Sequence, residues 1–114
     1  MHEVSVAESL LKTVIDQAET HNCTKVDKVI IKIGRASGIV SEALTFAFDA
    51  LKPGTIAQNA VIEVIDVPVS GICHSCGSDF NVDEKYVLAC PCCGSPSFKL
   101  TAGAELELSE LEVN

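Results

Sequence analysis

The chain has 114 residues, 47% of them hydrophobic, and 16 acidic side chains against 8 basic ones give a formal net charge of -8. This length supports one main hydrophobic core together with a small accessory lobe. Phosphate backbones require a basic face on the protein, so the acidic balance argues against a nucleic-acid-binding protein. It favours protein partners or cations.

The sequence contains no segment of the length needed to span a membrane and no secretory signal near its start. Its 6 cysteines, in the absence of such a signal, indicate a reducing compartment and metal binding rather than disulfides. We therefore expect a cytoplasmic protein.

The first predicted element is an amphipathic helix over residues 5–20. Ser5 and Glu8 have the spacing of a capping box, with the serine at the N-cap. Apolar residues recur on one face of this segment at helical spacing, namely Ala7, Leu10, Leu11, Val14, Ile15 and Ala18.

A strand, a second helix and a second strand follow. β-branched residues predict a strand over residues 25–33, and the loop at residues 34–38 lacks the lysine of a phosphate-binding loop, so we interpret it as a tight turn. The helix is predicted over residues 39–51, and a Lys-Pro-Gly sequence ends it. An apolar stripe that includes Phe46, widened by Leu44 and Phe48, is expected in the core. Residues 60–67 predict the second strand.

Four cysteines with regular spacing dominate the next stretch. Cys73 and Cys76 form one Cys-x-x-Cys-Gly motif, and Cys90 and Cys93 form a second. Four thiolates fill a tetrahedral site completely, so this spacing predicts a structural rather than a catalytic zinc ion. Cys92 breaks the frame of the second motif, and we interpret it as a spare thiol. The alternatives are two disulfides and an iron ion in the same sulfur environment.

The metal-binding lobe carries few apolar residues of its own. Residues 79–84 predict a polar turn and residues 86–88 a short strand, with Phe80, Tyr86 and Phe98 as a small apolar pad. Structural zinc contributes roughly 10–16 kcal/mol in small peptides, far more than three aromatic side chains can, so the ion is expected to stabilise this lobe.

The last segment, residues 104–113, alternates leucine or valine with glutamate. The alternation changes parity near Ser109 and Glu110, which predicts a strand with a bulge. This strand needs a sheet partner, and the other long strands lie before residue 68. We therefore expect it to return to the first lobe.

Together these elements predict an α+β fold. The first domain comprises two helices and a three-stranded sheet over residues 1–69, completed by the strand at residues 104–114. A zinc-ribbon domain is inserted at residues 70–103. An inserted lobe with two connections would also permit exchange of elements between two chains in a homodimer.

The sequence Met1-His2-Glu3 opens the chain. The terminal amine of Met1, the first peptide nitrogens and the imidazole of His2 can close small chelate rings around one ion, and Glu3 can add a carboxylate oxygen. Nitrogen-rich tetragonal coordination suits Ni(II) or Cu(II). A histidine at position 2 is more often just a terminal residue, so these residues alone leave the assignment open.

The combination of an opening Met-His-Glu-x-Ser, an amphipathic helix, a β-α-β stretch and two Cys-x-x-Cys-Gly motifs resembles the HypA/HybF family of hydrogenase maturation nickel chaperones. The resemblance extends over nearly the whole chain in order and spacing. Cys92 departs from it, because the family usually has two cysteines in the second motif.

The resemblance implies a nickel-binding first domain with His2 as the main nickel ligand, supported by Met1 and Glu3, and zinc held by the four motif cysteines. It also implies a HypB-type GTPase partner and delivery of nickel to the large subunit of a nickel-iron hydrogenase. Such a protein transfers metal and is not an enzyme. His74, between two zinc thiolates, is a candidate pH sensor, although a solvated loop residue is the simpler interpretation.

A zinc-ribbon adaptor that binds another protein and uses no nickel is the main alternative function. The number of nickel ions bound per chain distinguishes the two candidate functions, because only the chaperone requires a nickel site.

Overall fold

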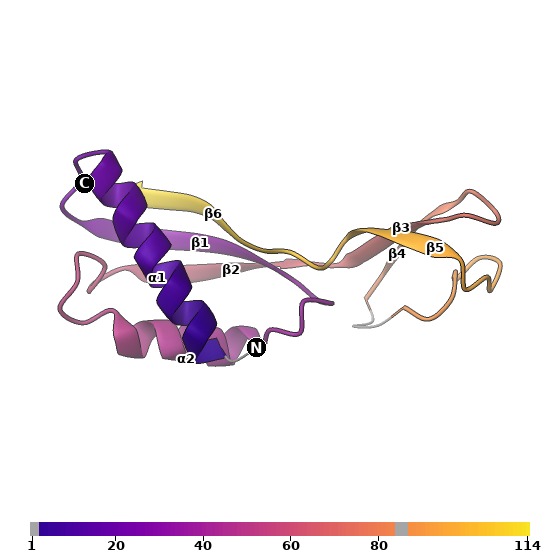
Figure 1. Ribbon diagram of the computed structural model, residues 1–114, viewed down its shortest axis with the longest axis horizontal. Helices are drawn as coiled ribbons and strands as arrows, with labels where there is room; N and C mark the ends of the chain where they lie inside the picture. The colour runs from indigo at the N-terminus through magenta and orange to yellow at the C-terminus, as the bar shows by residue number, and fades with distance from the viewer. Residues whose placement is uncertain (1–2, 84–86) are drawn as a thin grey trace. The chain divides into compact units, whose positions relative to one another are not determined.

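The computed structural model describes residues 3–83 and 87–114 (Figure 1). It contains two helices and six strands, α1 (Glu3–Thr20), β1 (Val26–Gly34), α2 (Ser41–Leu51), β2 (Val61–Val67), β3 (Val69–Cys73), β4 (Asp79–Val82), β5 (Phe98–Ala102) and β6 (Leu106–Val113). The strands form two three-stranded sheets, with orders β2-β1-β6 and β4-β3-β5. This confirms the predicted α+β fold class. Among the described residues, neither helix is long and apolar enough to cross a membrane.

The chain divides into two compact units. The first comprises residues 1–31, 39–65 and 107–114, and the second comprises residues 32–38 and 66–106. The C-terminal strand β6 lies beside β1 and so returns to the sheet of the first lobe, as expected from its need for a partner. The exact domain boundaries drawn from the sequence stay a prediction.

The first unit has an aliphatic core between its helices and its sheet. Helix α1 contacts α2, and β1 contributes alternate buried side chains, because successive residues of a strand point to opposite faces. The buried set includes Val14, Val29, Ile31, Leu44 and Phe48. With so few aromatic residues in the chain, branched aliphatic side chains fill most of this space.

The second unit is built around β3, which pairs antiparallel with both β4 and β5. Gly71 lies opposite Phe80, and a Cβ at Gly71 would come within 2.5 Å of the Phe80 ring. Phe80 meets Phe98 edge to face, with ring centroids 5.7 Å apart. The predicted contact between these two aromatic residues is confirmed, and Tyr86 lies outside the described residues.

Four local predictions were wrong. Helix α1 begins at Glu3, so Ser5 lies inside it and is not its N-cap. Phe46 is 78% exposed rather than part of the core, to which α2 contributes other members of the predicted stripe, Leu44, Ala47 and Phe48. Strand β4 replaces the turn expected at residues 79–84, because it pairs with β3, and residues 87–88 form no strand.

The loop that follows β1 is held by backbone hydrogen bonds within the second unit. Gly34 N–H donates to Glu105 O at 2.7 Å, and Ala36 N–H donates to Gly103 O at 2.7 Å. A Cβ at Gly34 would lie only 2.1 Å from Gly103 O. This close approach of two backbone segments explains why residue 34 is a glycine. It also supports the interpretation of residues 34–38 as a tight turn.

Substitution of Gly34 by alanine should therefore cost about 3 kcal/mol or more of unfolding free energy, because two backbone segments must separate. Gly38 is the matched control: it has a φ of 80° but open space around its Cβ, so Gly38→Ala should cost only about 1 kcal/mol. Urea denaturation of both variants measures the difference. Equal losses would contradict the role given to the Gly34 contact.

Candidate metal centre

The four motif cysteines converge in the second unit. The Sγ atoms of Cys73, Cys76, Cys90 and Cys93 all lie within 4.8 Å of one another. Cys73 and Cys93 are 3.5 Å apart, and Cys76 and Cys90 are 3.8 Å apart. Zinc–sulfur bonds of about 2.3 Å give a tetrahedron with edges of about 3.8 Å. The donor set therefore fits zinc in both chemistry and size.

The first Cys-x-x-Cys motif forms a tight knuckle at the end of β3. The N–H of Cys73 donates to Ser78 O at 3.0 Å, and its carbonyl accepts from Gly77 N–H at 3.0 Å. Gly77 has a φ of 72°, a conformation that glycine adopts at little cost. The turn brings the Cys76 sulfur back towards that of Cys73.

The second motif repeats the same hydrogen bonds at the same spacing. Cys90 N–H donates to Ser95 O at 2.8 Å, the Cys90 carbonyl accepts from Gly94 N–H at 2.8 Å, and Gly94 has a φ of 77°. In both motifs the first cysteine is buried and the second is exposed. The repeat places Cys93 in the position that Cys76 occupies in the first knuckle, and it leaves Cys92 outside the cluster of four.

His74 and three serines for which no role was predicted join the two knuckles. The hydroxyls of Ser75 and Ser95 are 2.8 Å apart, His74 N–H donates to Ser97 O at 3.0 Å, and His74 Nδ1 is 3.1 Å from Ser97 Oγ. The sequence contains a signal for Ser95, because each Cys-x-x-Cys motif continues as Cys-Gly-Ser. His74 therefore has a structural contact across the site.

The pKa values of two thiols in the cluster, Cys76 and Cys93, are shifted in opposite directions. The hydroxyl and the backbone amide of Ser78 lower the pKa of Cys76 to about 6. The Ser95 amide acts to lower the pKa of Cys93, but the Cys73 thiol and desolvation outweigh it and raise that pKa to about 12. Four adjacent thiolates therefore need a cation, and a divalent ion reduces their charge from -4 to -2.

The pKa values of Cys90 and its near neighbour Cys92 are also shifted in opposite directions. Backbone N–H groups of Cys93 and Cys92 lower the pKa of Cys90, opposed by desolvation. Desolvation, followed by the nearby charge of Cys90, raises the pKa of Cys92. The pKa of Cys93 is raised as well, so the position of its sulfur atom, and not its acidity, separates Cys92 from the cluster of four. All 6 cysteines are free of disulfides.

The predicted nickel ligands lie at the other candidate site, the N-terminus. Met1 and His2 are outside the described residues. Glu3 is the first residue of α1, and its Oε2 accepts a hydrogen bond from the backbone N–H of Val40, at 3.4 Å. Val40 is the N-cap residue of α2, which has no side-chain cap of its own. Glu3 thus supplies, from α1, a side-chain contact at the N-terminus of α2.

Comparison with known proteins gives a full-length match. The family model described as hydrogenase/urease nickel incorporation, metallochaperone, HypA matches residues 1–113. The hydrogenase maturation factor HypA of Dechloromonas aromatica (strain RCB) is 41% identical over 113 residues, which are 99% of each chain. A protein of the same name from Acidithiobacillus ferrooxidans (strain ATCC 53993 / BNL-5-31) is 37% identical over the same share of both chains.

Solved structures match the fold over the same extent. The solution structure of the Ni metallochaperone HypA from Helicobacter pylori has a TM-score of 0.72 at 26% identity, covering 99% of this chain and 97% of that one. A second structure, described as the solution structure of HypA protein, has a TM-score of 0.74 at 26% identity, with coverage of 100% and 97%.

Proposed function

This chain belongs to the HypA family of nickel-incorporation metallochaperones, and from that premise we propose that it binds Ni(II) at its N-terminus and helps to deliver the ion to the large subunit of a nickel-iron hydrogenase. The family resemblance inferred from the sequence is confirmed. The observation that carries the proposal is the extent of the match, which runs from residue 1 to residue 113 and so includes both candidate metal sites.

The proposed nickel ligands are the imidazole of His2, the amine of Met1 and the carboxylate of Glu3. Amine, amide and imidazole nitrogens favour Ni(II), and the Glu3 carboxylate, which accepts a hydrogen bond from the backbone N–H of Val40, would add an oxygen. Nickel is the cargo here. A site at a chain end suits a carrier, because its ligands can leave the ion one at a time.

The proposed zinc ligands are Cys73, Cys76, Cys90 and Cys93. Their clustered sulfur atoms and the repeated knuckle hydrogen bonds support this choice over one that includes Cys92. With four protein ligands, zinc would have no open position, and its contribution is to fold the lobe. Nothing in this arrangement requires catalysis, in keeping with a maturation factor.

We further propose that a HypB-type GTPase cooperates in the transfer and that the process takes place in the cytoplasm. The support for the GTPase is family membership. The support for the compartment is a set of free cysteines suited to reducing conditions.

The proposal predicts one nickel-binding site that depends on His2 and not on the zinc site. Zinc-loaded protein with an unmodified N-terminus should bind about one Ni(II) per chain in equilibrium dialysis, and His2→Ala should lose it, because the imidazole closes the chelate. Zinc content should be unchanged in the variant. Both metals can be counted in the same sample by mass spectrometry.

His21→Ala is the matched control, because His21 is exposed and its Nδ1 contacts Gln17 O in the last turn of α1. This variant should bind nickel normally. Equal nickel binding by His2→Ala and the native protein, or none by either, would contradict the terminal site. The zinc-ribbon adaptor would then be the better account.

A further inference from the structure

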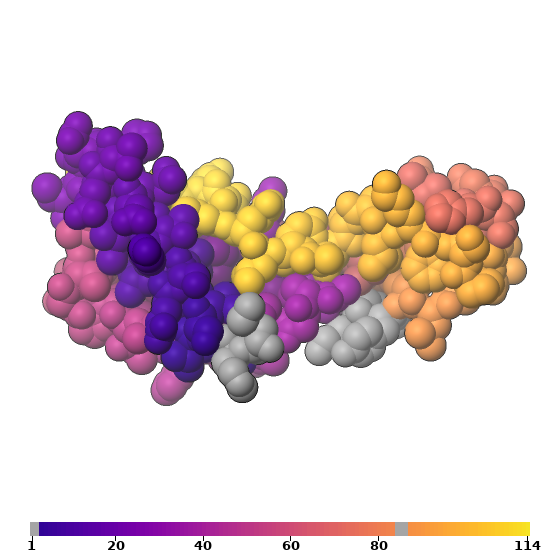
Figure 2. Space-filling model, viewed as in Figure 1, coloured from indigo at the N-terminus to yellow at the C-terminus, as the bar shows by residue number. Residues whose placement is uncertain are grey.

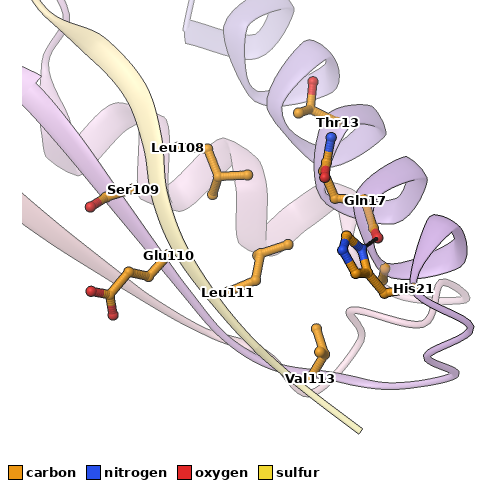
Figure 3. A pocket seen from close by; sticks show the side chains of 9 residues that line it. Thr13, Gln17, His21, Leu108, Ser109, Glu110, Leu111 and Val113 are labelled. Atoms are coloured by element: carbon orange, nitrogen blue, oxygen red, sulfur yellow. Dashed lines mark hydrogen bonds between the residues drawn. The ribbon is translucent and has the colours of Figure 1, made fainter.

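A groove runs along the free edge of the first sheet. It has a volume of about 530 Å³, and its lining residues come from the second half of α1, from His21 just after that helix and from β6 (Figure 3). The sheet order β2-β1-β6 leaves one side of β6 without a strand neighbour in the described part of the chain. An edge strand presents unpaired backbone N–H and C=O groups that can accept another strand. The groove thus adjoins a backbone edge that is available for pairing.

The groove has an apolar floor. Leu108, Leu111 and Val113 point from β6 towards α1, whereas Ser109 and Glu110 point away (Figure 3). Two consecutive residues on the same face confirm the change of alternation predicted for this strand. The three apolar side chains are only half-buried, so an additional apolar side chain placed beside them would remove further surface from water.

The wall of the groove is one row of α1. Thr13 and Gln17 are four residues apart on one face of the helix, and His21, in the turn that follows, continues this row. His21 Nδ1 donates to Gln17 O at 2.9 Å, which leaves the second ring nitrogen for another partner. In the space-filling view, the C-terminal strand, in yellow, is visible at the surface beside α1, in indigo (Figure 2).

The edge itself is acidic. Strand β6 carries Glu107, Glu110 and Glu112 and has no basic residue. The neighbouring strand β1 carries two lysines, and one of them, Lys28, is paired with Glu63 at 2.8 Å and also interacts electrostatically with Glu112 and Glu110. The three glutamates of β6 together with Glu63 outnumber these two lysines, so the edge keeps an excess of negative charge that cationic groups of a ligand can match.

We propose that β6 and this groove bind an extended segment of a partner protein in which apolar and basic side chains alternate. Successive side chains of a strand point to opposite faces. A fourth strand paired with β6 would direct its apolar side chains into the groove beside α1 and its basic side chains to the opposite face, where Glu110 points. Main-chain hydrogen bonds provide affinity in this mode, and the alternating side chains provide selectivity. The inference goes beyond nickel binding and does not depend on it.

The test uses the full chain, zinc-loaded and free of nickel, with a blocked eight-residue peptide of alternating lysine and valine that matches the eight residues of β6. NMR titration should show saturable binding, and hydrogen exchange should slow at the outward amides of β6. Added salt should weaken the binding, because charge complementarity contributes to it. An otherwise identical peptide of alternating glutamate and valine should not bind.

Two α1 variants separate the groove from the rest of the surface. Gln17→Trp places a large side chain in the groove and should weaken binding roughly tenfold or more, since it takes the space of a buried apolar side chain. Glu19→Trp is the control, because Glu19 is exposed on the same helix but does not line the groove. Both substitutions are at exposed positions of the helix, so the fold should be retained.

Three results would overturn the proposal. The first is equal binding of the lysine peptide to Gln17→Trp and Glu19→Trp. The second is protection of β2 rather than β6. The third is protection of β6 that rises with protein concentration when no peptide is present, because a second copy of the chain would then be the occupant.

Discussion

Replacing Cys93 with serine should release the zinc and unfold the β4-β3-β5 sheet, whereas the same change at the adjacent Cys92 should leave both intact. Cys93 belongs to the cluster of four sulfur atoms and Cys92 does not. Binding of structural zinc is worth roughly 10–16 kcal/mol in small domains, so loss of one ligand removes the main stabilising contribution. Metal content after dialysis against a mild chelator, together with amide NMR signals from β3 to β5, measures both effects.

The second unit has little else to hold it together. Its buried hydrophobic residues among those described are Ile33, Val69, Cys73, Phe80 and Cys90, and two of these are proposed zinc ligands. The first unit, with most of the buried residues, should keep its helical signal in the Cys93 variant. Loss of zinc from Cys92→Ser with retention in Cys93→Ser would instead show that the ligand frame is shifted by one residue.

The cluster of four cysteines could be predicted because its signal is local. Two Cys-x-x-Cys-Gly motifs encode both the donor atoms and the glycine that each knuckle needs, and nothing distant has to be known. The serines around the site were not predicted as contacts because their partners lie in the other knuckle. The hydroxyl pair of Ser75 and Ser95 exists only once both turns have been brought together.

The short strands of the second unit were also hard to predict, because they depend on partners that are distant in the sequence. Strand β4 has a polar sequence that favours a turn, yet it becomes a strand because β3 offers it a partner, with Gly71 opposite Phe80. The β propensity of a segment depends strongly on the side chains of the neighbouring strands. In contrast, β1 and β2 were predicted to within one residue at each end, because their long β-branched runs carry a strong local pattern.

Helix α2 shows where a periodic pattern becomes ambiguous. Its sequence is apolar around much of its circumference, so the position of the buried face cannot be fixed from spacing alone. Phe48 is fully buried and Phe46 is 78% exposed, although both were included in the predicted stripe. The choice between them is set by how α2 packs in the folded unit, including its contact with α1, which the local sequence does not determine.

Alanine substitution at these two positions should therefore give very different results. Phe48→Ala should lower the free energy of unfolding of the first unit by about 3–5 kcal/mol, because it leaves a cavity in a closely packed core. Phe46→Ala removes the same atoms from a mostly exposed site on the same helix and should change stability by no more than about 0.5 kcal/mol. Urea denaturation followed by the helical circular dichroism signal reports on this unit, since both helices belong to it.

The pair also controls for helix propensity, because both variants replace phenylalanine with alanine inside α2. Alanine is the better helix former, so propensity alone would stabilise both proteins slightly. A large loss for Phe48→Ala must then come from the core rather than from the helix itself. Similar losses at the two positions would mean that Phe46 is covered in solution, for example by a second molecule, and protein concentration would then shift the unfolding midpoint of the native chain.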